Sequence, residues 1–179
     1  MHNVIIPTDL IEQHNTYAMV VYAILQTTLN YGNGEVTVMP EWIGDKLGYE
    51  FPLSRKKREK INNTFKYLNE FGYLKKYKKY YKVNTDNFYN HKTYTKCNIF
   101  VFDELCCTPN LLRHYLVLKD CVEKDFSLEY YANREGVAPS TIRRYNRDLE
   151  SLGLIKINTA TYNPASGKRC GNNSYTVIN

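Results

Sequence analysis

The sequence predicts an α+β protein, mainly helical, in which two similar units follow one another along the chain. Three observations lead to this prediction: one segment recurs in both halves, apolar residues recur at helical spacing before it, and short apolar runs follow it. The chain has 179 residues and 43% of them are hydrophobic, so two units of about 80–90 residues can each bury a small core. We expect a first unit over residues 1–84, a linker over 85–97 and a second unit over 98–179.

The repeat is clearest where the last helical segment of each half ends. Residues 68–75 have the sequence LNEFGYLK, and residues 149–156 have the sequence LESLGLIK. In both copies an apolar helical face stops at a glycine, Gly72 or Gly153, and an apolar strand pattern begins directly after it. Glycine adopts the left-handed conformation that ends a helix and turns the chain sharply. Upstream, the copies align Ile61 with Ile142, Gly48 with Gly136, Gly44 with Ala132, Tyr22 with Tyr115, and residues 3–10 with 98–105.

In the first half the pattern predicts three helices, a short strand and a hairpin. The second helix opens at Pro40, because proline is tolerated in a first helical turn. The expected helices span residues 16–29, 40–47 and 54–71, the strand spans 36–38, and the hairpin pairs 74–77 with 80–84 around Lys78 and Lys79.

The second half repeats this order with a longer hairpin. Ser140 is expected to cap the third helix, because its hydroxyl can accept a hydrogen bond from a free backbone N–H. We expect helices over residues 110–123, 128–135 and from 140, a tight turn over 136–139, and strands over 154–161 and 174–178 that flank a wing over 162–169. Helix, short strand, helix, turn, helix and hairpin is the order of elements in winged-helix domains.

The most specific pattern is a helix-turn-helix over residues 128–147. A small residue at Ala132 lets two helices cross closely, and Gly136 makes the turn between them. Ile142 and Tyr145, three residues apart on one face, hold the next helix on the core. Exposed arginines on such a helix suit the major groove, where Arg pairs bidentately with guanine. The alternative is an αα-hairpin of a protein–protein module with solvated arginines. The side chains expected to face DNA are Ser140, Thr141, Arg143, Arg144 and Arg147.

Basic clusters in the first half and in both hairpins extend the expected DNA-contacting surface. Residues 55–60 have the sequence RKKREK and precede Asn62 and Asn63, whose amides can pair with adenine. Lysines on a hairpin suit phosphate contact rather than base recognition. The alternatives are a solvated helix face and lysines that protect a sheet edge. The expected contacts here are Arg55, Lys56, Lys57, Arg58, Lys60, Asn62, Asn63, Lys75, Lys76, Lys78, Lys79, Lys168 and Arg169.

Residues 5–10 (IIPTDL), the helix after them and the run through Asn84 carry a family resemblance. They are similar to the N-terminal winged-helix region of replication initiators and replisome organisers from plasmids and phages of low-GC Gram-positive bacteria. The second unit resembles winged-helix regulators more broadly. The resemblance implies binding to an origin or operator, often as dimers or higher assemblies. Many such initiators carry a further C-terminal helicase-loading domain, which these 179 residues do not include, and this favours a smaller role such as regulation.

Charge and residue usage narrow the function classes. The net charge of +6 suits a nucleic acid, an anionic membrane surface or an acidic protein as partner. No apolar run is long enough to span a bilayer, and residues 1–10 lack the pattern of a signal peptide, so we expect a cytoplasmic protein without a membrane partner. The five cysteines form no CxxC pair and the four histidines stand far apart, which argues against disulfides and a zinc site.

Motifs of enzymatic chemistry are missing from the sequence. It has no paired-histidine metal motif, no GxxxxGK phosphate-binding loop followed by Ser or Thr, and no GxSxG elbow. We therefore expect no catalytic residue, no cofactor, no metal and no small-molecule substrate. The expected partner is double-stranded DNA, and the resemblance is compatible with a homodimer. Three hypotheses stay open: an origin-binding replication protein, a transcriptional regulator, and a protein–protein adaptor that uses the same fold without DNA.

Overall fold

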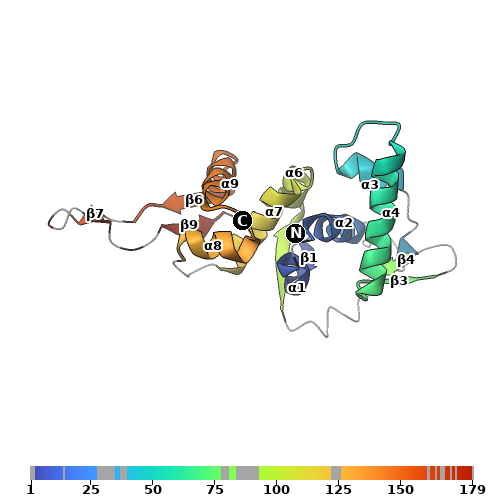
Figure 1. Ribbon diagram of the computed structural model, residues 1–179, viewed down its shortest axis with the longest axis horizontal. Coiled ribbons are helices and arrows are strands. Elements are labelled where there is room, and N and C mark those ends of the chain that lie inside the picture. The colour runs from blue at the N-terminus through green and yellow to red at the C-terminus, as the bar shows by residue number, and fades with distance from the viewer. Residues whose placement is uncertain are drawn as a thin grey trace. The chain divides into compact units, whose positions relative to one another are not determined.

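The computed structural model confirms an α+β, mainly helical chain (Figure 1). The described part contains eight helices and small antiparallel sheets. The structure describes residues 3–13, 15–27, 35–36, 40–77, 81–83, 93–121, 126–160, 162–163, 165, 168–169, 171 and 173–178, with main chain only at 35, 36, 162, 163, 168 and 169. The chain divides into two compact units, residues 1–109 and 110–179.

The first unit extends beyond the expected residues 1–84, because part of the expected linker is a strand. β5 (Tyr94–Asn98) pairs antiparallel with β1 (Asn3–Pro7), and α6 (Ile99–Leu105) follows within the same unit. Alternate residues of β5, Thr95 and Cys97, are buried, and this two-residue period is too short to stand out in the sequence. The structure therefore ends the first unit at residue 109, instead of starting a linker at 85 and a second unit at 98.

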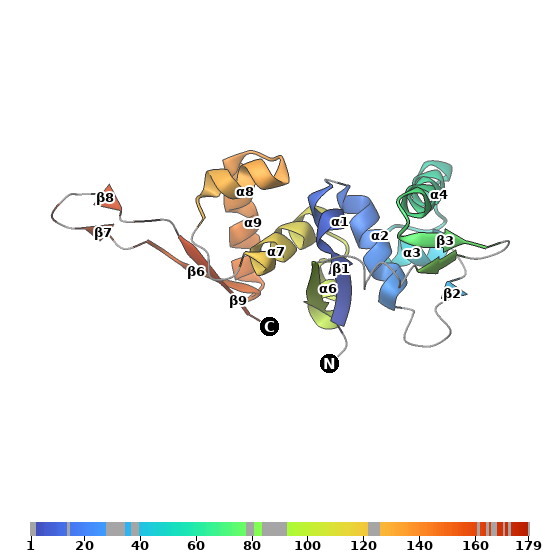
Figure 2. The same cartoon turned by 90° about the horizontal axis from the view of Figure 1, so that it is seen from below.

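The first unit contains three longer helices and a three-stranded antiparallel sheet in the order β2-β4-β3 (Figure 2). These elements confirm the expected helices and hairpin, and β2 shares Val36 with the expected short strand. Of the expected ranges, residues 28, 29, 37, 38, 80 and 84 lie outside the described residues. The elements are α1 (Thr8–Glu12), α2 (Thr16–Thr27), β2 (Glu35–Val36), α3 (Pro40–Lys46), α4 (Arg55–Glu70), β3 (Leu74–Lys76) and β4 (Tyr81–Val83).

An apolar stripe along α4 forms part of the core of the first unit. Ile61, Phe65 and Leu68 are buried, and their spacing places them on one face of the helix. Ser54 caps the helix, because its hydroxyl accepts a hydrogen bond from the backbone N–H of Lys57 at 3.3 Å. Gly72 follows the helix with φ of 78°, so the predicted left-handed turn into β3 is confirmed.

Each repeat begins with a strand and a short helix, a pair that the sequence did not predict. β1 leads into α1, and β5 leads into α6, which Asn98 caps by accepting a hydrogen bond from the backbone N–H of Phe100 at 3.0 Å. Asn3 begins its strand, whereas Asn98 ends its strand. The expected alignment of residues 3–10 with 98–105 is therefore out of register, although the two segments do have matching structures.

The second unit has the expected order of elements. α8 is confirmed at both ends, and the two strands of the expected hairpin, β6 and β9, pair antiparallel. A short ribbon of β7 and β8 lies farther along this hairpin from α8 and α9 (Figures 1 and 2). The elements are α7 (Pro109–Asp120), α8 (Leu128–Glu135), α9 (Pro139–Ser151), β6 (Ile155–Asn158), β7 (Tyr162–Asn163), β8 (Lys168–Arg169) and β9 (Ser174–Val177).

Two details of the second unit differ from expectation. α7 ends at Asp120, before the expected residue 123. The prediction that Ser140 caps α9 is wrong, because Ala138 holds the N-cap position without a side-chain hydrogen bond and Pro139 is the first helical residue. Proline suits that place, since its φ is already helical and its missing N–H would have no partner in the first turn. Ser140 thus lies inside the first turn of α9.

Candidate nucleic-acid interface

α9 separates an apolar face from a basic face. Ile142 and Leu149 have no exposed surface and Tyr145 is 8% exposed, which confirms that this side lies on the core. At 100° per residue, the positions opposite these side chains carry the basic residues. The exposed side chains on this basic face are Ser140, Arg143, Arg144 and Arg147, and Thr141 beside them is half-buried. The structure therefore brings the expected residues of the second recognition helix together on one surface.

The three arginines of α9 form no ion pair with any residue in the described part of the chain. Arg144 lies over the ring of Tyr145, with 5.4 Å between the guanidinium carbon and the ring centre. Glu150, a carboxylate on the same helix, accepts a hydrogen bond from the backbone N–H of Ile157 in β6 at 3.1 Å. The donors of the three guanidinium groups therefore remain available to another molecule.

A three-residue turn sets the start of α9 against the end of α8. Gly136 has φ of 68°, and the backbone N–H of Val137 donates to the carbonyl oxygen of Ala132 at 3.0 Å. Ala132 is buried at 3% exposure, as expected for a small residue where two helices cross. The predicted tight turn is thus confirmed. It places the first turn of α9 at the surface, with the basic face beginning directly after it.

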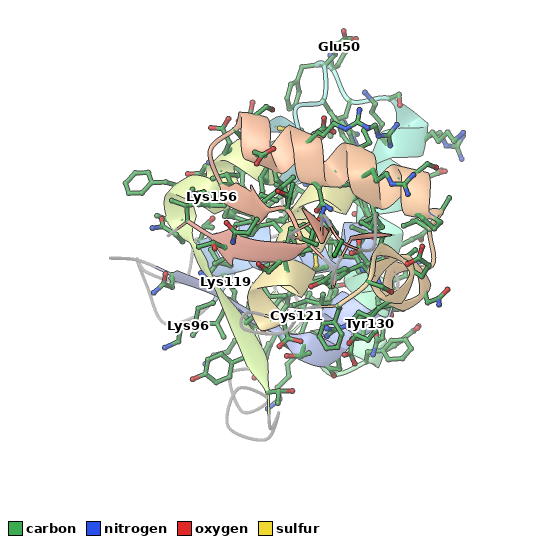
Figure 3. The ribbon with its side chains drawn as sticks, turned by 90° about the vertical axis from the view of Figure 1, so that its left-hand side faces the viewer. Glu50, Lys96, Lys119, Cys121, Tyr130 and Lys156 are labelled. Atoms are coloured by element: carbon green, nitrogen blue, oxygen red, sulfur yellow. The ribbon has the colours of Figure 1, made fainter. Side chains whose placement is uncertain are left out.

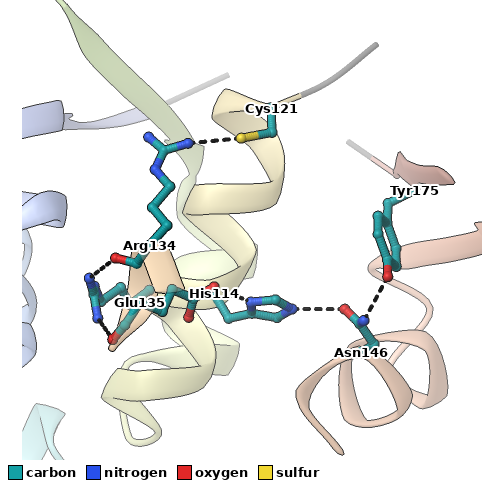
Figure 4. Close-up of polar contacts among 7 residues, drawn as sticks. His114, Cys121, Arg134, Glu135, Asn146 and Tyr175 are labelled. Carbon is teal, nitrogen blue, oxygen red and sulfur yellow. Dashed lines mark hydrogen bonds and ion pairs between the residues drawn. The ribbon is translucent and has the colours of Figure 1, made fainter. Parts of the chain in front are cut away.

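A buried chain of polar side chains joins α9 to three other elements of the unit (Figure 4). His114 of α7 lies between Glu135 of α8 and Asn146 of α9, with Nδ1 2.6 Å from Oε1 of Glu135 and Nε2 2.8 Å from Oδ1 of Asn146. The Asn146 amide then donates to the hydroxyl of Tyr175 in β9 at 3.1 Å. His114 has no exposed surface, and Glu135 and Asn146 are nearly as buried.

This polar chain positions α9, and the sequence prediction missed it. Burial raises the pKa of Tyr175. Polar groups inside a core are costly unless they are hydrogen-bonded, so these contacts favour one orientation of α9 relative to α7, α8 and β9. The sequence does contain a signal for this polar chain. His114 and Asn146 are polar residues at positions where the helical period of α7 and α9 otherwise places apolar residues.

The hairpin of the second unit carries the other cations that were expected to contact DNA in this unit. Lys156 on β6, a residue that we did not single out, is exposed next to α9 (Figure 3). Lys168 and Arg169 lie in β8, whose main chain pairs with β7, and the expected contacts of their side chains lie outside the described residues.

In the first unit, α4 carries its cations in a different setting. Arg55 pairs with Glu59 at 2.9 Å, and Arg58 pairs with Glu41 of α3 at 2.7 Å. Two lysines lie over tyrosine rings, with Lys57 Nζ 4.5 Å from the ring centre of Tyr49 and Lys60 Nζ 3.9 Å from that of Tyr17. These four expected contact residues therefore each have a partner within the first unit, while Arg55 and Arg58 stay exposed at the surface.

A smaller set of polar and basic residues is exposed on the outward face of α4. Lys56, Asn62 and Asn63 are exposed as expected, and so is Lys66, which the sequence prediction omitted. The alignment of Ile61 with Ile142 contained the signal, because it places Lys66 at the position of Arg147. A shallow groove of about 440 Å³ runs beside this face. Its lining residues are Asn15, Lys56, Glu59, Lys60, Asn63, Thr64 and Tyr67.

The hairpin of the first unit is tied to α4. Lys75 and Lys76 of β3 are exposed, and the backbone N–H of Lys76 donates to the Asn69 side chain of α4 at 2.9 Å. The basic strand therefore keeps a fixed place beside the helix. Lys78 and Lys79, expected at the hairpin tip, lie outside the described residues.

Comparisons with known proteins found no match, whether to a family model, to a curated protein or to a solved structure. Within the described residues no helix is long and apolar enough to cross a membrane. The same residues contain no group of three or more His, Cys, Asp or Glu side chains placed to hold a metal ion.

Proposed function

We propose that the chain is a double-stranded-DNA-binding protein built from two winged-helix units, and that it binds an origin or operator site. The observation that carries this proposal is the basic face of α9. Arg143, Arg144 and Arg147 project from one side of a helix whose other side is locked to the core. A single helix with exposed guanidinium groups fits the major groove, where arginine donates two hydrogen bonds to a guanine edge.

The element order of the first unit supports the winged-helix assignment. A helix, a short strand, two further helices and a hairpin follow one another, and the short strand adds to the hairpin in the order β2-β4-β3. In such a unit the second of the two adjacent helices contacts the major groove and the hairpin contacts the flanking backbone. α4 and α9 occupy that place in the order, each directly before a hairpin.

The distribution of lysines supports DNA as the partner. Lys75 and Lys76 are exposed on the hairpin beside α4, and Lys156 is exposed on the hairpin beside α9. Cations that flank a recognition helix neutralise phosphates and release counterions, which supplies affinity without regard to sequence. Base contacts from the helix then supply specificity. Both roles are therefore provided on neighbouring elements of each unit.

The proposal is tested by two matched triple variants of α9 in the full chain. Replacing Arg143, Arg144 and Arg147 with alanine is expected to lower affinity for a selected duplex and to flatten its salt dependence. The lysine version, R143K/R144K/R147K, keeps the charge but loses bidentate geometry. It should keep affinity for scrambled duplex and lose most of its preference for the selected one, because each good base contact is worth about 1–3 kcal/mol of discrimination.

Two outcomes would count against the proposal. An unchanged affinity in a folded alanine variant would remove α9 from the interface. A wild-type chain that shows no salt-dependent affinity for any duplex would instead favour a protein–protein adaptor. If binding is specific, mapping the bound sequence relative to replication origins and promoters separates replication from transcriptional regulation.

A further inference from the structure

We infer that the DNA site of this chain is asymmetric, with a guanine-containing half-site contacted by α9 and an adenine-containing half-site contacted by α4. This inference rests on the proposed function and names the base pairs that its two recognition helices would select. It follows from a comparison of the same three surface positions on the two helices.

The two helices are aligned by their buried residues. Ile61 of α4 and Ile142 of α9 have no exposed surface, and Leu68 and Leu149, seven residues later in each helix, are equally buried. The positions one, two and five residues after each isoleucine therefore project to matching places. In α9 they carry Arg143, Arg144 and Arg147, and in α4 they carry Asn62, Asn63 and Lys66. All six side chains are exposed.

The chemistry at these positions selects different bases. An arginine at a base edge donates two hydrogen bonds to N7 and O6 of guanine. An asparagine amide donates one and accepts one, which matches N7 and the amino group of adenine. The repeats have thus diverged at two of the three positions, where Asn62 and Asn63 replace Arg143 and Arg144, whereas Lys66 keeps the positive charge of Arg147.

The arginines of α4 do not restore guanine recognition to the first unit. Arg55 is held by Glu59, and Arg58 is held by Glu41 of the neighbouring helix. A guanidinium already paired with a carboxylate must give up that contact before it can pair with guanine, which lowers the net gain. In the described part of the second unit no carboxylate pairs with the arginines of α9. The ion pairs of α4 lower what Arg55 and Arg58 would gain at a guanine edge, and the amides of Asn62 and Asn63 occupy the positions that match Arg143 and Arg144.

An asymmetric site has a consequence for how the protein binds. A homodimer that contacts DNA through two identical recognition helices selects a palindrome, because each half-site is contacted by the same helix. Two different recognition helices on one chain, α4 and α9, select two different half-sites. A single chain therefore binds in one orientation on the duplex. A directional complex of this kind distinguishes one side of its site from the other.

The test selects duplexes from a randomised pool with the full-length wild-type chain and with two double variants, N62A/N63A and R144A/R147A. The pool is long enough to hold half-sites one or more helical turns apart. Wild type should enrich a non-palindromic pair of half-sites. Each variant should lose preference only in its own half, by about 5- to 150-fold for each lost bidentate contact. Circular dichroism and thermal melting confirm that each variant is folded.

A gain-of-preference variant makes the test sharper. N62R/N63R should convert the adenine-containing half-site into a guanine-containing one, so that the enriched site becomes a repeat of similar halves. Enrichment of two identical half-sites by wild type, or no change in N62A/N63A, would overturn the inference while leaving DNA binding intact. Absence of salt-dependent binding by wild type would instead overturn the proposed function itself, and the inference with it.

Discussion

Arg113 and Arg134 of the second unit differ from the arginines of α9 in what surrounds their guanidinium groups. Arg113 is 6% exposed and donates to the carbonyl oxygen of Glu135 at 2.9 Å, and its burial lowers the pKa of the side chain. Arg134 contacts Asp120 at 2.6 Å. It also donates to the sulfur of Cys121 at 2.8 Å (Figure 4). Donors satisfied inside the protein stabilise the fold, whereas exposed donors are open to a ligand.

Gly153 provides a test at the same scale. It has φ of 69°, and nothing lies within 4 Å of where a Cβ would be added. Gly153→Ala is therefore expected to cost about 1–2 kcal/mol through backbone conformation alone, because an L-residue resists the left-handed region. Denaturant unfolding measures the loss, and affinity for scrambled duplex serves as the control. An unchanged unfolding midpoint would contradict the left-handed turn between α9 and β6.

At the scale of elements, the polar chain through His114 fixes the position of α9. A stripe of apolar contacts alone tolerates small rotations and slides of a helix, whereas hydrogen bonds act at set distances and directions. Because Asn146 contacts both His114 and Tyr175, α9 is held from α7 on one side and from β9 on the other. The distance between the basic face of α9 and the hairpin that contains β9 is therefore fixed.

Graded loss of stability is expected along this chain of contacts. Tyr175→Phe removes one hydrogen bond and should cost about 0.5–1.5 kcal/mol. His114→Leu leaves the Glu135 carboxylate buried without its ring partner and should cost about 3–5 kcal/mol. Tyr131→Phe is the matched control, because it removes a hydroxyl of the same aromatic cluster that is not part of this chain. Equal losses of unfolding free energy in all three variants would contradict a positioning role for His114.

At the scale of the whole molecule, a moderate net charge of +6 is concentrated by the fold. Exposed cations lie on α9, on α4 and on the hairpins, and several cations, among them Arg58 of α4, pair with carboxylates within the protein. Under the proposed function, the positive charge that a duplex would meet is therefore local to these elements. Affinity for any duplex should fall as salt rises, in proportion to the number of phosphates contacted.

The hairpin lysines allow that number to be measured. Lys75→Ala and Lys76→Ala together should weaken binding to selected and scrambled duplexes by the same factor, because phosphate contacts carry no sequence information. The slope of log affinity against log salt should fall by about 0.9 for each phosphate contact that is lost. A loss confined to the selected duplex would mean that this hairpin contacts bases.

Much of this architecture could be predicted because its signals are local. Helical spacing located α2, α4 and α8, the glycines after α4 and α9 located the turns, and apolar runs located both hairpins. β5 and the short helices were missed because a five-residue strand is defined by its partner β1 rather than by its own pattern. The same reason explains the misplaced boundary between the two units.

The sequence by itself determined the order of the longer helices and the hairpins, the repeat and the face of α9 that carries arginine, because periodicity alone decides which residues share a face. Only the tertiary structure decided which cations are available. Arg58 meets a carboxylate from α3, and Lys60 meets a ring from α2, and neither contact can be deduced from sequence spacing. The buried contacts of His114 likewise arise between segments 21 and 32 residues apart. Periodicity is a property of one segment, whereas the partner of a side chain is set by how separate segments pack.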